Sequence, residues 1–448
     1  MQYFIETYGC QMNKAESAAL EIIFRERGWT CAADPEDAAL VLINTCSVRI
    51  TAENRAWGRI DHYASRKRER AAGGRPLALV VTGCMAERMK REIKGRQPAV
   101  DYVVGTFQKQ AFGLVLDAVE SGRHLGDIDE SPAFVFAKSY YEPGSFRSFL
   151  PIMHGCDNFC TYCIVPHIRG REISRNPSDI LAELEALEDS GVREVTLLGQ
   201  NVNSYRHRDE ATGTELDFPA LLRLIASRLR ERGRAGVRWI RFMTSHPKDL
   251  SDEAIRAIAE EEVYCRHIHL PVQSGSDAML RAMNRKYTRD GYLALVDRMK
   301  KDLPGVSLST DLIVGFPGES EEDLEATLDL MRGVEYSYAY MYHFNPREGT
   351  PAASMEGRVP EKVKKERLAR VIALQQETTR RLMEARIGVV EEVLVEGPSR
   401  RKKTEVLGRT QRDEMVVFPA PAGRIGDFAR VRLLSLSGNT FKGEEILS

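Results

Sequence analysis

Three short apolar segments near the start of the chain each lead into a cysteine, and this repeat restricts the fold more than any other feature. Each segment reads as a β-strand and is followed within two residues by a cysteine: 3–8 by Cys10, 38–44 by Cys46 and 77–82 by Cys84. The cysteines are 36 and 38 residues apart, close to the length of one strand–helix–strand unit. Apolar strands separated by helical segments predict an open parallel sheet that is covered on both faces.

These cysteines are placed where ligands bind in open α/β sheets. The carboxyl ends of parallel strands lie along one edge of such a sheet. We therefore expect Cys10, Cys46 and Cys84 to converge and to share a metal centre. The alternative is three ordinary buried cysteines, which have no reason to recur at the same place in three successive units. Cys31 and Cys265 lie outside any motif and fit that ordinary role.

A chain of 448 residues has room for about three domains. The sequence divides into an α/β domain at 1–126, a connector at 127–148, a second α/β domain at 149–379 and a β-rich domain at 380–448. The connector mixes Asp, Glu, Ser, Pro and Gly with aromatic residues and shows no clear period. Such a change of pattern is typical of a domain boundary.

The second α/β domain contains six strand-like segments with helices between them, at 150–154, 194–199, 238–245, 266–272, 307–315 and 336–344. Six strands are too few for a closed eight-stranded barrel, so we predict an open, partial (β/α)6 barrel. The Ser-Glu-Glu-Asp sequence at 320–323 predicts a capping box at the start of one helix. A long charged helix at 358–386 leads out of this domain.

The last domain has a period of two residues, with short segments at 390–395, 405–408, 415–418 and 429–433. Gly and Pro turns separate the segments, and the pattern predicts a small antiparallel β-barrel. The Arg-Arg-Lys-Lys run at 400–403 falls on one of its turns and is suited to contact a nucleic-acid backbone. Overall charge gives no such indication, because 64 Lys and Arg face 65 Asp and Glu.

A second set of cysteines follows the first strand of the partial barrel, with the spacing C-x3-C-x2-C: Cys156, Cys160 and Cys163. Three thiolates are one ligand short for the four irons of a cubane cluster, so one iron stays open to a substrate. A structural zinc site requires a fourth Cys or His at a regular spacing. His154 and His167 are the nearest candidates, and neither has that spacing.

Through this motif at the start of a partial barrel, the sequence resembles the radical S-adenosylmethionine superfamily. The resemblance implies that the open iron binds S-adenosylmethionine. An electron from the cluster then cleaves this cofactor to a 5′-deoxyadenosyl radical. The resemblance also implies cofactor contacts from residues at the strand ends and beside the last cysteine: Tyr162, Gln200, Ser245, Gln273 and Asp311.

Nearly the whole chain is similar to the methylthiotransferases, and in particular to their MiaB branch. The similarity rests on the stretches at 7–13 (TYGCQMN), 44–49 (NTCSVR), 82–86 (TGCMA) and 166–172 (PHIRGRE). It implies two [4Fe–4S] clusters. The radical-generating cluster is held by Cys156, Cys160 and Cys163. An auxiliary cluster, which carries the inserted sulfur, is held by Cys10, Cys46 and Cys84. The last domain is similar to the RNA-binding TRAM domain.

This similarity implies an enzyme that converts N6-isopentenyladenosine beside the anticodon into its 2-methylthio derivative. Its expected partners are the tRNA anticodon stem-loop, a reducing electron donor and a sulfur source. Two relatives leave alternatives, since one acts on N6-threonylcarbamoyladenosine in tRNA and another on an aspartate of a ribosomal protein. A non-catalytic RNA-binding iron–sulfur protein is an alternative from a different class, although a structural cluster normally fills its fourth ligand position.

The expected location is the cytoplasm, without a membrane partner. The first residues (MQYFIETY) lack the charged and apolar regions of a signal peptide, and no run of 18 apolar residues occurs. In a reducing compartment, spaced cysteines are more often metal ligands or catalytic thiols than disulfides.

Overall fold

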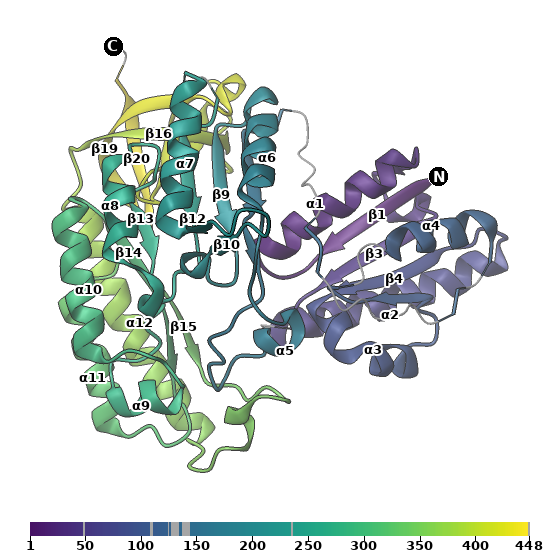
Figure 1. Ribbon diagram of the computed structural model, residues 1–448, viewed down its shortest axis with the longest axis horizontal. Helices are drawn as coiled ribbons and strands as arrows, with labels where there is room; N and C mark the ends of the chain where they lie inside the picture. Colours follow the sequence, from purple (N-terminus) through teal and green to yellow (C-terminus); the bar gives the residue numbers. More distant parts are fainter. Residues whose placement is uncertain are drawn as a thin grey trace.

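The structure is a computed structural model that describes residues 1–47, 50–107, 111–123, 125–126, 134–136, 144–233 and 236–446. It consists of an N-terminal α/β domain, a central α/β barrel and a small β-barrel next to the central one (Figure 1). Most of the predicted connector at 127–148 lies outside the described residues, as do Val48 and Arg49 of one quoted motif. Within the described ranges, no helix combines the length and apolar character that crossing a membrane requires.

The N-terminal domain is built on a parallel five-stranded sheet in the order β2-β1-β3-β4-β5. The strands are β1 (Gln2–Thr7), β2 (Thr30–Cys31), β3 (Leu40–Thr45), β4 (Ala78–Gly83) and β5 (Tyr102–Val104). The helices are α1 (Gln11–Glu26), α2 (Ile50–Ala72), α3 (Cys84–Arg96) and α4 (Phe112–Ser121). The predicted open parallel sheet is confirmed, and it gains the short edge strands β2 and β5.

Strand β3 shows why this sheet is covered on both faces. All six of its residues are buried. Val41 and Ile43 belong to one apolar cluster, whereas Leu40 and Leu42 belong to another. Because successive side chains of a strand point to opposite faces, the two clusters lie on the two sides of the sheet. The strand therefore reads as a continuous apolar run, as expected for a buried parallel sheet.

The central barrel has six parallel strands in two groups, β6-β9-β12 and β13-β14-β15. A parallel bridge between Ile240 and Tyr264 joins the groups. The strands are β6 (Arg147–Pro151), β9 (Glu194–Leu198), β12 (Trp239–Phe242), β13 (His267–His269), β14 (Ser307–Val314) and β15 (Tyr338–His343). The predicted partial barrel is confirmed.

Helices alternate with these strands: α6 (Pro177–Asp189), α7 (Phe218–Glu231), α8 (Asp252–Glu260), α9 (Asp277–Ala282), α10 (Arg289–Asp302) and α11 (Glu321–Val334). The capping box at the start of α11 is confirmed, because Ser320 and Asp323 each bond the other's backbone nitrogen. A short helix, α5 (Val165–Arg169), follows the cysteine loop. Two small strand pairs complete the domain: β7 (Met153–His154) with β8 (Ile173–Ser174), and β10 (Arg206–Arg208) with β11 (Glu215–Asp217).

Helix α12 (Glu361–Glu384) leads into a closed five-stranded barrel in the order β16-β17-β18-β20-β19. Its strands are β16 (Val390–Pro398), β17 (Glu405–Thr410), β18 (Met415–Pro419), β19 (Phe428–Ser437) and β20 (Thr440–Glu445). The prediction of a wholly antiparallel barrel is wrong in one pair, since β18 and β20 run parallel. The unpredicted strand β20 forms a hairpin with β19 and inserts next to β18, and this closes the barrel.

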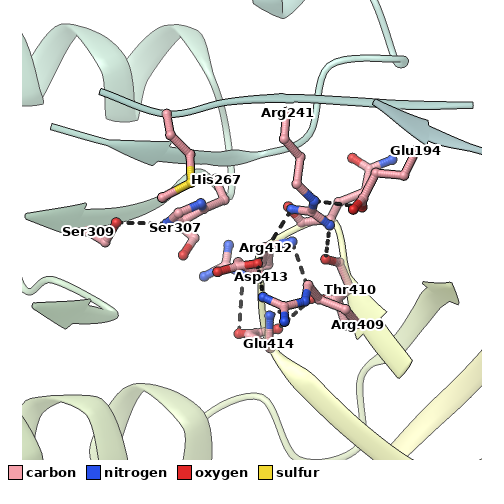
Figure 2. Close-up of polar contacts among 12 residues, drawn as sticks. Glu194, Arg241, His267, Ser307, Ser309, Arg409, Thr410, Arg412, Asp413 and Glu414 are labelled. Carbon is pink, nitrogen blue, oxygen red and sulfur yellow. Dashed lines mark hydrogen bonds and ion pairs between the residues drawn. The ribbon is translucent and has the colours of Figure 1, made fainter. Parts of the chain in front are cut away.

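The turn between β17 and β18 packs against the amino ends of the central barrel strands (Figure 2). Arg241 of β12 donates from Nη2 to the Thr410 carbonyl at 2.7 Å and from Nη1 to the Gln411 carbonyl at 3.1 Å. Its Nε bonds Glu194 at 2.7 Å, and both of these side chains are buried. The Tyr338 hydroxyl reaches Asp413 of the same turn at 3.0 Å. The C-terminal barrel thus closes one end of the central barrel.

Candidate active site between two cysteine sets

The first cysteine set occupies the carboxyl edge of the N-terminal sheet. Cys10 is the residue before α1, Cys46 directly follows β3, and Cys84 is the first residue of α3, directly after β4. Strands β1, β3 and β4 are neighbours in the sheet, so the three turns lie side by side. Cys46 and Cys84 are buried, whereas Cys10 is exposed. The expected placement of the three cysteine-bearing turns at one edge of the sheet is confirmed.

Two glycines allow these turns to approach each other closely. Gly9 has a φ of +126°, and a Cβ atom there would lie 2.8 Å from Cβ of Cys46. Gly83 has a φ of +90°, and its Cβ would lie 2.3 Å from Oδ1 of Asn44 and 2.4 Å from the Thr45 carbonyl. Both positions need glycine, because another residue would be strained at such φ values and would collide with the neighbouring turn.

A buried amide pair holds the same turns in place. Asn13 donates from Nδ2 to the carbonyls of Thr45 at 2.8 Å and Tyr8 at 3.0 Å, which precede Cys46 and Cys10. Asn44 donates from Nδ2 to the Asn13 carbonyl at 2.9 Å. The Oδ1 atom of Asn13 faces the sulfur of Cys10 at 3.5 Å. The network fixes the backbone around two cysteines without placing a competing ligand among them.

The second cysteine set lies in the loop between β7 and α5. The Cys163 backbone nitrogen donates to the Cys160 carbonyl at 2.9 Å, which makes a tight turn. Asn158 Nδ2 lies 3.4 Å from the sulfur of Cys156, and Arg285 Nη1 lies 3.4 Å from the sulfur of Cys160. Side-chain donors therefore point at two of the three sulfurs, as is common around iron–sulfur clusters.

Burial disfavours the anionic form of Cys84 in the first set and of Cys163 in the second. Burial raises the pKa of Cys84 to about 11, and the negative charges of Glu16, Cys46 and Cys10 act in the same direction against Arg169. Burial also raises the pKa of Cys163 to about 12, with a further contribution from Cys160. Neighbouring buried thiols with raised pKa values become thiolates when a positively charged metal centre binds them.

Each cysteine set offers three thiolates, which are the usual protein ligands of iron–sulfur clusters. In a [4Fe–4S] cubane each cysteine binds a different iron, so three cysteines leave one iron open. The donor sets fit the two predicted clusters.

The two sets lie next to each other in space. Ile164 and Ile168, which follow Cys163 directly and by five residues, pack against Cys84 of the first set. Thr106 of the N-terminal domain donates to the Ile168 carbonyl at 3.0 Å. Figure 1 shows α5 between the N-terminal sheet and the central barrel. The segment that follows Cys163 therefore packs against the turn that carries Cys84.

Two of the predicted cofactor contacts lie beside the second set, and a third is buried after strand β12. Gln200 accepts a hydrogen bond through Oε1 from the Gly155 backbone nitrogen at 2.6 Å, next to Cys156. The ring of Tyr162 packs edge-on to Phe316 with centroids 6.5 Å apart. Ser245 is fully buried, and its hydroxyl has no hydrogen-bond partner among the described residues. A buried hydroxyl of this kind is suited to a bound ligand.

The other two predicted contacts are brought together by the backbone. The Gln273 nitrogen donates to the Asp311 carbonyl at 2.9 Å, and Ile313 donates back to the Gln273 carbonyl at 2.9 Å. Gln273 has a φ of +71°, a strained value for a residue with a side chain. The carboxylate of Asp311 lies 3.5 Å from Nε2 of the buried His269. Gln273 and Asp311 are therefore neighbours on the wall of the central barrel.

Comparison with known proteins identifies the family. The chain is 48% identical to the tRNA-2-methylthio-N(6)-dimethylallyladenosine synthase of Treponema denticola over 99% of both chains. It is 44% identical to the synthase of that name from Bacteroides thetaiotaomicron, over 99% of this chain and 96% of the other. The chain belongs to this family. It is a radical S-adenosylmethionine methylthiotransferase of the MiaB branch.

Three family models match separate parts of this synthase-family chain, and two solved structures share its fold. The models described as Uncharacterized protein family UPF0004, Radical SAM superfamily and TRAM domain match residues 2–105, 150–331 and 384–444. The radical S-adenosylmethionine methyltransferase TsrM from Kitasatospora setae superposes with a TM-score of 0.57 at 15% identity, over 79% of this chain and 77% of that one. The enzyme OxsB gives 0.53 at 13% identity, over 85% and 56%. These likenesses concern the fold.

Sequence reasoning missed two arginines that contact cysteine sulfurs in this synthase-family chain. Arg285, in the segment after α9, bonds Cys160, and nothing in its surrounding sequence indicates that role. Arg169 lies 3.3 Å from the sulfur of Cys84. It belongs to the 166–172 stretch that carries the family resemblance. The sequence therefore marked this segment as important but did not indicate what Arg169 contacts.

Proposed function

We propose that this chain inserts a methylthio group at carbon 2 of N6-isopentenyladenosine beside the tRNA anticodon. N6-isopentenyladenosine is the nucleoside that the relatives' name gives as N(6)-dimethylallyladenosine. The observation that carries the proposal is the contact between the two cysteine sets, in which Ile164 and Ile168 pack against Cys84. Sulfur can be added to the activated carbon of the base only if the site that makes the radical and the site that holds the sulfur lie close together.

We assign the radical-generating [4Fe–4S] cluster to Cys156, Cys160 and Cys163. The auxiliary cluster, which presents the sulfur, is assigned to Cys10, Cys46 and Cys84. When bound, the first cluster supplies the electron that cleaves S-adenosylmethionine to a carbon-centred radical. In each set three thiolates leave one iron open.

The side chains around the second set have positioning roles in this proposal. The strand-end residues Gln200, Ser245, Gln273 and Asp311 would hold the cofactor, together with Tyr162 inside the cysteine loop. Ser245 offers a hydrogen bond from a buried position, and Gln200 fixes the backbone before Cys156. The buried position of Ser245 helps to keep water away from a reactive radical.

The RNA partner is tRNA, and we propose its anticodon stem-loop as the part that enters the site. Loop bases are the easiest to unstack, and the target base must leave the stack to reach the cysteine sets. The exposed basic run at 400–403 lies in the C-terminal barrel, which closes the opposite end of the central barrel from the cysteine loop. A bound tRNA therefore extends along the molecule from one end to the other.

The reaction also needs components from outside the chain. We propose a low-potential electron donor and a sulfur source for the auxiliary site, and a location in the cytoplasm, where tRNA is modified. These components are needed whichever modified adenosine is the substrate.

The substrate is tested with two synthetic anticodon stem-loops that differ only at the target base. One carries N6-isopentenyladenosine and the other N6-threonylcarbamoyladenosine. The reconstituted protein is incubated with S-adenosylmethionine, sulfide and a strong reductant, and the RNA nucleosides are measured by mass spectrometry. We expect a 2-methylthio product from the first RNA alone. Product from the second RNA would show that the substrate is N6-threonylcarbamoyladenosine, as in the related tRNA enzymes. Absence of 5′-deoxyadenosine would indicate a non-catalytic RNA-binding protein.

A further inference from the structure

A buried arginine of the central barrel contacts a cysteine of the first set. Arg169, at the end of α5, donates from Nη2 to the sulfur of Cys84 at 3.3 Å. The same Nη2 lies 3.5 Å from Oδ1 of Asn13, which in turn faces the sulfur of Cys10 at 3.5 Å. The Arg169 side chain is only 3% exposed. The guanidinium thus lies inside the protein, directly against the proposed auxiliary site.

A buried carboxylate, that of Glu16, balances the charge of Arg169. Glu16 of α1 accepts from Nη1 at 2.8 Å and from Nη2 at 3.3 Å, and its side chain is 6% exposed. An Arg–carboxylate pair with two hydrogen bonds has a fixed geometry, and the guanidinium stays protonated at any working pH. Burying such a pair away from water costs free energy, and this cost is offset only when the pair has good geometry and its remaining donors and acceptors are hydrogen-bonded.

The two members of this pair lie at unequal distances from the cysteine sulfur. The guanidinium donates to the sulfur of Cys84, while the carboxylate binds the guanidinium. A cluster held by three thiolates is negatively charged, and it gains a further negative charge on reduction. Hydrogen bonds to its sulfurs and nearby charges set its reduction potential. Arg169 favours the reduced state of a cluster bound here, and Glu16 opposes it.

We propose that Arg169 is a positioning residue for the auxiliary cluster. It orients the sulfur of Cys84 and, together with Glu16, sets the reduction potential of the cluster. The inference rests on the proposed assignment of the auxiliary cluster to Cys10, Cys46 and Cys84. Because Arg169 follows Cys163 by six residues, one short segment carries a ligand of the radical cluster and the donor to the auxiliary one.

The test measures the potential of the auxiliary cluster by itself. In a parent chain with Cys156, Cys160 and Cys163 changed to Ala, the reconstituted protein is titrated electrochemically and followed by electron paramagnetic resonance. Arg169→Met removes the donor and its positive charge, so we expect a lower midpoint potential. Glu16→Gln removes a negative charge but keeps the packing, so we expect a higher one. Arg169→Lys, which keeps the charge, should lie closer to the parent than Arg169→Met.

Opposite shifts from two members of one ion pair distinguish this role from simple packing, which would not give them opposite signs. The double variant Glu16→Gln/Arg169→Met removes both charges of the pair together, so it guards against misfolding caused by the unpaired Glu16 carboxylate in Arg169→Met. It should retain iron and show a changed resonance spectrum. Arg285→Lys, at the other cysteine set, should leave the auxiliary potential unchanged.

Unchanged potentials and spectra in all Arg169 and Glu16 variants would overturn the inference and leave the proposed function intact. A parent chain that binds no cluster would instead overturn the assignment of the auxiliary site, and the inference with it.

Discussion

Arg241 in the central barrel donates from Nη2 to the Thr410 carbonyl in the C-terminal barrel at 2.7 Å, across 169 positions of sequence. The side chain is 9% exposed, and its Glu194 partner is 5% exposed. The amino end of the catalytic barrel is therefore closed by a turn of the predicted RNA-binding module. Removing residues 380–448 would open that end, so a truncated chain cannot report on RNA binding alone.

We expect Arg241→Met to destabilise the joined barrels by about 3–5 kcal/mol, because it leaves the Glu194 carboxylate buried without its partner. Arg238→Met is the matched control at the same interface. Arg238 pairs with Glu392 at 2.6 Å but is 43% exposed, so its loss should cost about 1 kcal/mol. Urea unfolding followed by Trp239 fluorescence, in a Trp29→Phe/Trp57→Phe background, reports on this interface. Equal midpoints for the two variants would contradict the prediction.

Gly83 should be intolerant of a side chain. Gly83→Ala places a Cβ 2.3 Å from Oδ1 of Asn44 at a strained φ, so the turn before Cys84 must move. We expect the reconstituted variant to hold about half the iron of the parent chain. Gly58→Ala is the control, since Gly58 lies within α2 with no atom near a new Cβ. It should keep its iron and gain about 0.5–1 kcal/mol. Full iron in Gly83→Ala would argue against the tight turn.

Iron content also tests the division of the cysteines into two sets. Anaerobic reconstitution should give about eight irons per chain, four for each cubane. A chain with Ala at Cys156, Cys160 and Cys163 should keep about four and form no 5′-deoxyadenosine. Loss of all iron from that variant would show that the six cysteines do not form independent sites.

Acid should destabilise the protein through a buried histidine. Burial lowers the pKa of His267 to about 3, whereas the pKa of a histidine in an unfolded chain is about 6.5. Between these values the unfolded chain binds a proton that the folded chain does not, so stability falls as the pH decreases. The loss is at most about 1.4 kcal/mol per pH unit from this residue. His267→Asn should reduce the slope of unfolding free energy between pH 7 and 5, and an unchanged slope would exclude His267 as its source.

Much of this architecture follows from local patterns in the sequence. The strands before Cys10, Cys46 and Cys84 and the capping box at Ser320 depend on neighbours within one element, and these predictions are confirmed. The edge strands β2 and β5 have two and three residues, too few to show a period. The parallel pairing of β18 with β20 arises when the barrel closes. It therefore depends on contacts between strands and cannot be predicted from the pattern of residues within either strand.

The buried ion pairs could not be predicted for a different reason. Arg169 and Glu16 are 153 positions apart in the sequence. Arg241 bonds a backbone carbonyl, and every residue has a backbone carbonyl, so the sequence does not show which one an arginine will bond. In the sequence each of these arginines looks like an ordinary surface residue. The roles of Tyr162, Gln200, Ser245, Gln273 and Asp311 toward the cofactor stay predictions.

The central claim is that one cysteine set makes the radical and the other delivers the sulfur. The Cys46→Ala variant tests it most directly, with N6-isopentenyladenosine stem-loop RNA, S-adenosylmethionine and a reductant. Formation of 5′-deoxyadenosine and of the 2-methylthio nucleoside is measured in the same reaction by mass spectrometry. We predict that 5′-deoxyadenosine still forms, because Cys156, Cys160 and Cys163 are intact, while the 2-methylthio product is lost. A 2-methylthio product formed at the rate of the unaltered chain would contradict the account.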